Sequence, residues 1–320
     1  MKKHILWLML ALMLLTAGCG TRSADTPTPP PKQEAVTEVP AEVTPAPDSE
    51  QKPPAEEVPA ETAPEQPAEK LPVEEPAPEA AVHTGPLPIL MYHHVVPNGT
   101  ECNSMTVTVG KLEKDFQWLK DHNYTPILPR DLVSGAPLPQ RPVLITFDDG
   151  YRSNYELLFP LLQQYNMKAV ISVMVYMQDI NVSSFLSWDM CREMSESGLV
   201  EIGSHTYRLH NLDERNGNFT QGGINGIQRK PDESDEDFRS RVLDDIQKSH
   251  DLLETQLGTD VTFFAYPFGL READAEALIE ELFPVTVVTL KGTADLDDGI
   301  KNMPRYTVTV STKLSSILKK

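Results

Sequence analysis

The sequence predicts an α/β fold over about its last 235 residues, preceded by a long tether without stable structure. Short apolar runs alternate with helical patterns throughout residues 86–320, which is typical of parallel βα units with helices covering both faces of the sheet. A stretch of this length can bury one substantial core, so we expect a single folded domain there. The units can close into a (β/α) barrel or form an open doubly wound sheet.

The first 19 residues have the layout of a signal peptide. Lys2 and Lys3 precede an apolar stretch that is short for a membrane span, and small residues follow up to Cys19. The ending resembles a bacterial lipobox, although Thr16 stands where that motif usually carries an aliphatic residue. We expect Cys19 to be lipidated and to anchor the protein to the extracytoplasmic face of a cell membrane. The alternative is an ordinary cleaved signal in which Cys19 has no role.

The segment 20–85 is nearly all Pro, Ala, Glu, Thr and Val. Residues 22–85 hold 15 of the 28 prolines and no aromatic residue, so they cannot bury enough apolar surface to offset the entropy of ordering. We expect a disordered linker. With 14 acidic and 4 basic residues, 22–85 also carries about −10 of the formal −19, which argues against nucleic-acid binding.

The strand predictions rest on apolar runs, and the helix predictions rest on patterns of helical period between them. Strands are expected at Leu87–Tyr92, Val143–Phe147, Lys168–Val175, Val200–Ser204, Val261–Tyr266 and Val285–Leu290. Helices are expected at Lys111–His122, Ser153–Tyr165, Trp188–Ser197, Asp235–Leu257, Ala273–Phe283 and Thr312–Lys319. In either closure of such units, active groups gather at the carboxyl ends of the strands.

Reactive side chains follow three of the predicted strands. Asp148 and Asp149 come directly after one strand, His205 follows a second, and the turn Tyr266–Gly269 follows a third. Because parallel strands end at the same edge of a sheet, we expect these groups to meet there.

Adjacent carboxylates at a strand end point in different directions, so one can hold a metal ion while the other moves a proton. His205 and His210 can converge on the same cation, and with one carboxylate they leave positions open for water and substrate. We expect Asp149, His205 and His210 to be metal ligands, Asp148 to be a base, and a backbone N–H of Tyr266–Gly269 to face an oxyanion. The alternatives are an ordinary Asp-Asp-Gly turn and a solvated pair of histidines.

Residues 146–150, Thr-Phe-Asp-Asp-Gly, match letter for letter the first motif of the polysaccharide deacetylase family, also called the NodB-homology or carbohydrate esterase family 4 domain. The resemblance implies that Asp148 is the catalytic base and Asp149 a metal ligand. The second motif of the family is His-(Ser/Thr)-x-x-His, and here His210 comes one residue later. That spacing resembles the branch with deacetylases acting on poly-β-1,6-N-acetylglucosamine.

The segments Pro88–Val95 and Leu186–Trp188 are also similar to that branch, and the resemblance extends over most of Pro86 to Val310. It implies a distorted (β/α) barrel and a divalent metal, zinc first, with cobalt or nickel as alternatives. The activity that it implies is hydrolysis of N-acetyl groups on an N-acetylglucosamine polysaccharide. Peptidoglycan is an alternative substrate, since the linker could reach toward a cell wall. We expect the chain to act as a monomer.

Two departures from the family pattern concern catalysis. The third motif normally begins with an arginine that steadies the base, and Ala265 stands near that place. Arg305 is our candidate for the missing guanidinium; the alternative is a surface salt bridge. The family's general-acid histidine is also missing, because no histidine follows His250. His93 is a candidate for that acid, or else a packed structural histidine.

Other family features are weaker. Three aspartates lie where the fourth motif is expected, but the match is too poor to assign: Asp295, Asp297 and Asp298. Sugar contacts are expected from Pro267 and from three aromatic residues, each of which could instead belong to the core: Trp188, Tyr207 and Phe268. The polar stretch Asn211–Arg241 is predicted to flank the glycan groove.

Two questions stay open at this stage. Cys102 and Cys191 could form a disulfide or remain free thiols. The two departures favour a second hypothesis, a catalytically impaired glycan-binding lipoprotein that keeps the fold, whereas the intact Asp-Asp pair and two histidines favour the enzyme. A third reading, a structural protein of the cell envelope, has no positive support in the sequence.

Overall fold

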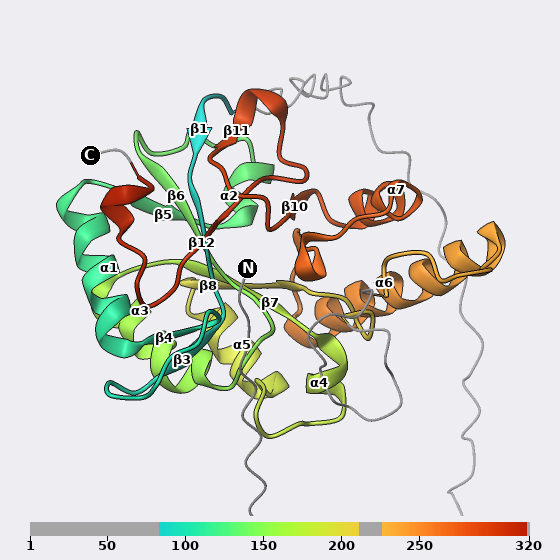
Figure 1. Ribbon diagram of the computed structural model, residues 1–320, viewed down its shortest axis with the longest axis horizontal. Coiled ribbons are helices and arrows are strands. Elements are labelled where there is room, and N and C mark those ends of the chain that lie inside the picture. The colour runs from blue at the N-terminus through green and yellow to red at the C-terminus, as the bar shows by residue number, and fades with distance from the viewer. Residues whose placement is uncertain (1–82, 211–225, 319–320) are drawn as a thin grey trace, which may run out of the picture. The chain divides into compact units, whose positions relative to one another are not determined.

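The computed structural model describes residues 83–210 and 226–318, and these lie within one compact unit, Val73–Lys320. Its centre is an eight-stranded parallel sheet in the order β10-β9-β8-β7-β6-β2-β12, with β5 also paired to β6 (Figure 1). The strands are β2 (Ile89–Tyr92), β5 (Thr125–Ile127), β6 (Pro142–Phe147), β7 (Ala169–Val173), β8 (Val200–Ser204), β9 (Phe263–Ala265), β10 (Val285–Val287) and β12 (Tyr306–Thr307).

One short segment near the C-terminus contacts both edges of this sheet. Met303 forms a parallel bridge with Val287 of β10, and Tyr306 pairs with Leu90 of β2. The sheet therefore curls round on itself, and the predicted distorted (β/α) barrel is confirmed. Helices surround it: α1 (Val109–Asp121), α2 (Pro129–Val133), α3 (Phe159–Tyr165), α4 (Val175–Asp179), α5 (Trp188–Glu196), α6 (Asp235–Leu257) and α7 (Ala273–Leu282).

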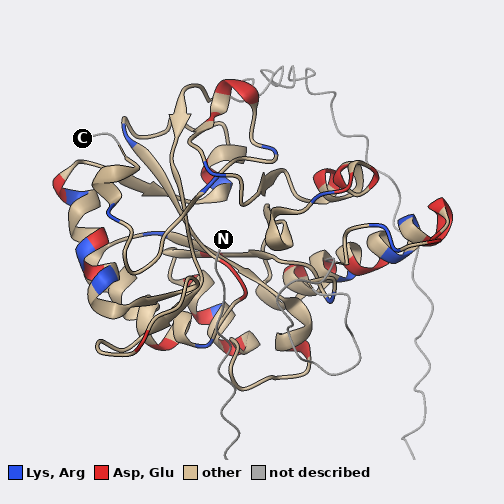
Figure 2. Cartoon of the chain, in the orientation of Figure 1, with Lys and Arg blue, Asp and Glu red and all other residues tan. Residues whose placement is uncertain are grey.

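Local sequence signals set the helix boundaries. The hydroxyl groups of Thr108, Ser187 and Ser234 precede α1, α5 and α6, and each accepts a hydrogen bond from a backbone N–H in the first turn. Helix α6 ends at Gly258, which adopts the left-handed conformation (φ 66°) that favours glycine. Charged residues lie mainly on the helices and connecting segments around the sheet (Figure 2).

The core has two parts because successive strand residues point to opposite faces. In β2, Ile89 packs into the cluster inside the curled sheet, and Leu90 packs into the cluster under the helices. In β6, Leu144 faces inward and Ile145 faces the helices. Alternation along each strand therefore determines which side chains can reach the inside of the barrel.

Several elements differ from the sequence-based expectation. Pro88, which lacks an N–H, interrupts the first expected strand, so β1 (Pro86–Leu87) pairs separately and antiparallel with β11 (Ala294–Asp295). Pro160 lies where a π-helical turn, Asn154–Leu158, gives way to α3. The short pair β3 (His94–Val96) and β4 (Thr106–Thr108) was not anticipated.

The predicted C-terminal helix Thr312–Lys319 is wrong over the part that the structure describes, where Leu314–Ser316 forms a single 3₁₀ turn. Hydroxyl side chains take part in the local hydrogen bonds instead, as when Thr312 accepts from the Thr309 N–H at 3.0 Å. Cys102 and Cys191 are free thiols. Among the described residues, none of the helices has the length and hydrophobicity to span a bilayer.

We predict that Gly203→Ala destabilises the fold. Gly203 lies in β8, and an added Cβ would come within 2.7 Å of both the Phe263 carbonyl oxygen and its ring in β9. Overpacking of this kind costs about 1–3 kcal/mol. Thermal unfolding of the full chain measures the loss.

Gly292→Ala is the matched control, because its added Cβ would come no closer than 3.2 Å to Pro304. We expect this variant to change the free energy of unfolding by less than about 1 kcal/mol. Equal melting temperatures for the two variants would contradict the prediction.

Candidate active site

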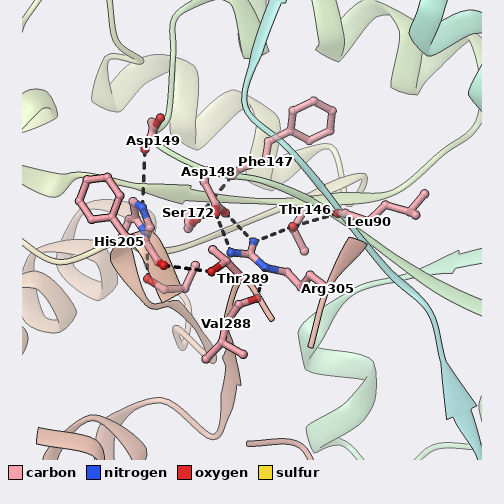
Figure 3. A network of polar contacts seen from close by, with 12 residues as sticks. Leu90, Thr146, Phe147, Asp148, Asp149, Ser172, His205, Val288, Thr289 and Arg305 are labelled. Carbon is pink, nitrogen blue, oxygen red and sulfur yellow. Dashed lines mark hydrogen bonds and ion pairs between the residues drawn. The ribbon is translucent and has the colours of Figure 1, made fainter. Parts of the chain in front are cut away.

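Two strand ends, those of β6 and β8, carry chemically reactive side chains to one place (Figure 3). In β6 the inward face continues from Leu144 through Thr146 to Asp148, directly beyond the end of the strand. In β8 the same alternation leads from Gly203, which faces Phe263 of the inner cluster, to His205. The period of two in each strand thus aims the carboxylate and the imidazole into the same interior.

Asp148 forms a bidentate ion pair with Arg305 inside the barrel. The Arg305 Nη1 donates to Asp148 Oδ1 at 2.8 Å, and Nη2 donates to Oδ2 at 2.7 Å. Both residues are buried, with the arginine at 0% exposure. The expectation that Arg305 reaches Asp148 therefore agrees with the geometry, and the alternative of a surface salt bridge does not.

Both partners of the ion pair make further hydrogen bonds. Arg305 Nε donates to the Val288 carbonyl at 3.0 Å, and Nη1 also donates to Thr146 Oγ1 at 2.9 Å. Ser172 Oγ in β7 donates to Asp148 Oδ1 at 2.9 Å. A buried ion pair needs such additional hydrogen bonds to offset its desolvation, and here the pair has them.

The ion pair keeps Asp148 ionised. Burial by itself raises the pKa of this carboxyl, but the Arg305 guanidinium, with smaller effects from His205 and His93, outweighs it. The net result holds the pKa of Asp148 well below its usual range.

Asp149, His205 and His210 lie close enough to hold one metal ion. The Nε2 atoms of the two histidines are 3.6 and 3.4 Å from Asp149 Oδ1, and the candidate ligand atoms all lie within 4.8 Å of one another. His205 Nδ1 lies 2.7 Å from the Ala265 carbonyl, which can only accept, so Nδ1 carries the proton. The Nε2 lone pair is therefore available to a cation.

Two further features suit this group to a metal. Burial lowers the pKa of His205 to about 4, which keeps the imidazole neutral, as a ligand must be. Asp149 adopts a left-handed backbone conformation (φ 74°), which Asp tolerates better than most residues. Gly150 follows in the same conformation, where an added Cβ would meet Val173 at 2.7 Å. The turn therefore separates the directions of the two adjacent carboxylates.

These residues open into a cavity of about 450 Å³. Besides the aspartates and histidines, its wall contains five apolar side chains: Met91, Met105, Met174, Phe185 and Phe268. His93 also lines it, and the Phe268 ring is 41% exposed with its centroid 4.7 Å from the His210 ring. Such a wall can receive an uncharged, partly apolar group beside the polar cluster.

Other predicted residues lie elsewhere. Trp188 and Tyr207 do not line this cavity: Trp188 packs against the helix-side core, and the Tyr207 hydroxyl donates to Asp179 at 2.7 Å. Both rings pack against the helix-side core, and their predicted sugar contacts stay predictions. Pro267 is buried in the turn after β9. The fourth-motif aspartates follow or belong to β11, which pairs with β1 and contributes nothing to the cavity wall.

Sequence reasoning missed Tyr151 and Ser172. Tyr151 lines the cavity; burial first, and then the Asp149 carboxylate, raise the pKa of its hydroxyl. Its position directly after the Asp-Asp-Gly motif was an available signal. Ser172 lies two residues after Val170, which belongs to the inner cluster, so strand alternation could have located it. Cys19 and residues 211–225 of the predicted loop lie outside the described residues.

Comparisons with known proteins show similarity to one family in sequence and in fold. A sequence model of the polysaccharide deacetylase family matches residues 135–283. The poly-β-1,6-N-acetyl-D-glucosamine N-deacetylase of Escherichia coli (strain K12) is 30% identical over 215 residues, which are 60% of this chain and 32% of that protein. This chain thus corresponds to about a third of that relative's length.

Two solved structures share the fold. A de-N-acetylase from Aggregatibacter actinomycetemcomitans matches with a TM-score of 0.63 and 24% identity, over 73% of this chain and 100% of that one. The BpsB deacetylase domain from Bordetella bronchiseptica matches with a TM-score of 0.57 and 26% identity. The match covers 72% of this chain and 97% of that domain. Over residues 135–283 the chain belongs to the polysaccharide deacetylase family.

Proposed function

We propose that this protein is a metal-dependent hydrolase that removes N-acetyl groups from an N-acetylglucosamine polysaccharide. The observation that carries the proposal is the meeting of Asp148, ion-paired with Arg305, and the Asp149, His205 and His210 group in one cavity. The Arg305 pairing removes one of the two departures that favoured an impaired glycan-binding protein.

Asp149, His205 and His210 would hold a divalent ion, which we propose to be zinc, with cobalt or nickel as alternatives. One carboxylate oxygen and two imidazole nitrogens are a donor set that these ions accept. When bound, such an ion supplies a Lewis acid that polarises the amide carbonyl and lowers the pKa of a water molecule.

Asp148 would accept the proton of the attacking water. A carboxylate has about four acceptor positions, two on each oxygen. Arg305 and Ser172 occupy both positions of Oδ1, whereas Oδ2 accepts one bond, from Arg305. Oδ2 is therefore the atom to which we assign the proton transfer.

The backbone of the turn after β9 would stabilise the oxyanion. The Tyr266 N–H donates to Val287 and the Gly269 N–H donates to Tyr266, and Pro267 has no N–H. The N–H of Phe268, a cavity-lining residue, is therefore our candidate for the oxyanion donor.

His93 would protonate the leaving amine. It lies in the cavity wall and is 8% exposed, and the Asn154 side chain donates to its backbone carbonyl at 3.1 Å, which fixes its segment. His93 would thus fill the role for which the sequence offers no histidine after His250.

The name of the E. coli relative leads us to propose poly-β-1,6-N-acetylglucosamine as the substrate, with peptidoglycan as the alternative. We further propose that the chain is anchored through a lipidated Cys19 on the extracytoplasmic face of a cell membrane, where either polymer is found. The signal-peptide pattern of residues 1–19 supports this location.

The full chain, supplied with Zn²⁺ or Co²⁺, should release acetate from β-1,6-linked N-acetylglucosamine oligomers faster than from β-1,4-linked ones. A chelator-treated sample is the control and should be inactive until metal is restored. Acetate is measured directly in the reaction mixture. If no oligomer releases acetate, the hydrolase proposal is wrong. Faster release from β-1,4-linked oligomers would instead indicate a peptidoglycan-type substrate.

The variants Asp148→Asn and Asp149→Ala should distinguish the role of general base from that of metal ligand. Asp148→Asn should keep the bound metal and lose about 10²–10⁴-fold in turnover, because a general base is removed. Asp149→Ala should lose metal as well as turnover, because a ligand is removed. Metal content and acetate release are measured on the same preparations. Metal loss in Asp148→Asn but not in Asp149→Ala would reverse the assigned roles.

Arg305→Ala should move the acid limb of the pH–activity profile to higher pH. Without the guanidinium, burial dominates and raises the pKa of Asp148, so the base becomes protonated as pH falls through this raised value. The unpaired carboxylate should also destabilise the fold by about 3–5 kcal/mol.

Arg305→Lys keeps the charge but loses the bidentate fork, so its acid limb should shift less than that of Arg305→Ala. The profile of kcat/KM against pH and the bound metal are measured for both variants and the parent. Profiles that superimpose on that of the parent would show that Arg305 does not hold the base ionised.

A further inference from the structure

The two histidines of the metal group are joined by a four-residue loop, Thr206–Leu209. Thr206 adopts a left-handed backbone conformation (φ 76°), which is unfavourable for a β-branched residue and needs support from its surroundings. The separation of His205 and His210 depends on the shape of this loop. What holds the loop therefore matters for any cation placed between them.

Helix α4 supports the loop carbonyls. The N–H of Val175 donates to the Thr206 carbonyl at 3.1 Å, and the N–H of Tyr176 donates to the Tyr207 carbonyl at 3.1 Å. Within the loop, the Thr206 hydroxyl accepts from the Leu209 N–H at 3.0 Å. The two bonds from Val175 and Tyr176 hold the loop against the first residues of α4, and the third bond stabilises the loop itself.

Helix α6 supports the loop N–H groups through one carboxylate. Asp245 Oδ1 accepts from the Tyr207 N–H at 2.9 Å, and Oδ2 accepts from the Arg208 N–H at 2.8 Å. One helical turn further on, Ser249 bonds to Ser204 at 2.6 Å through their buried hydroxyls. The same face of α6 thus holds the end of β8 and the middle of the loop.

The position of Asp245 calls for a carboxylate in particular. Two consecutive N–H groups point at its two oxygens, and both oxygens of a carboxylate accept. An asparagine of the same shape would offer one acceptor oxygen. Its NH₂ group would face the second backbone N–H, and two donors cannot form a hydrogen bond with each other. Asp245→Asn should therefore disfavour the observed loop conformation. It leaves no cavity, because the two side chains have the same shape.

We propose that Asp245 is a positioning residue: it acts through the Thr206–Leu209 loop to set the relative placement of His205 and His210, and thereby the affinity for a divalent metal. This inference rests on the proposed function, because it presumes that the two histidines hold a metal. Asp245 is not one of the three candidate metal ligands, and it does not line the cavity.

The test compares Asp245→Asn with Asp244→Asn in the metal-stripped full chain. Asp244 is the neighbouring exposed carboxylate on α6, so its change alters net charge equally without touching the loop. Zn²⁺ affinity is measured by calorimetry, and the ligand field by the visible absorption of added Co²⁺. We expect Asp245→Asn to bind Zn²⁺ at least about 10-fold more weakly and to change the Co²⁺ spectrum, with Asp244→Asn like the parent.

Parental affinity and an unchanged Co²⁺ spectrum in Asp245→Asn would overturn the inference while leaving the proposed function intact. A parent protein that binds neither ion would overturn both. Thermal unfolding of the metal-free proteins controls for folding. If metal-free Asp245→Asn is unfolded, Asp245→Glu takes its place: the longer side chain should displace the loop and alter the Co²⁺ spectrum, and an unaltered spectrum in folded protein would refute the inference.

Discussion

The buried ion pair between Asp148 and Arg305 is the interaction on which the rest of the site depends. Its partners are 157 positions apart in the chain, one at the end of β6 and the other immediately before β12. The segment that carries Arg305 is also the one that contacts β10 and β2 and curls the sheet. Closure of the sheet and ionisation of the Asp148 carboxylate are therefore linked, because a guanidinium this deep is stable only beside its partner.

Arg305 pairs with Asp148 although it lies in a different segment from Ala265, near which the sequence predicted the family's arginine. The Ala265 backbone remains useful, since its carbonyl accepts from His205 Nδ1 and directs Nε2 toward Asp149. The chemistry depends on where donor and acceptor atoms lie, and more than one part of the chain can bring them there.

Two layers of support surround the proposed metal group. The Ala265 carbonyl accepts a hydrogen bond from His205 Nδ1. The first residues of α4 and the Asp245 carboxylate of α6 bond to the loop that leads to His210. Each support makes a hydrogen bond that fixes a direction, which matters because metal affinity is sensitive to small displacements of the ligands. Helices that contribute no side chain to the cavity thereby contribute to its chemistry.

Sequence alone determined the α/β class, most strand and helix locations, and the meeting of Asp148, Asp149, His205 and His210, because apolar periodicity and strand-end position are local properties. Only the tertiary structure decided which distant groups complete the site. The sequence suggested Arg305 as a candidate but could not show that it lies beside Asp148. It gave no indication of Ser172 and Tyr151. Trp188 and Tyr207 lie outside the cavity. The reason is physical: a local pattern shows which face a side chain takes, whereas its partners across the barrel depend on how strands far apart in the chain align when the sheet curls.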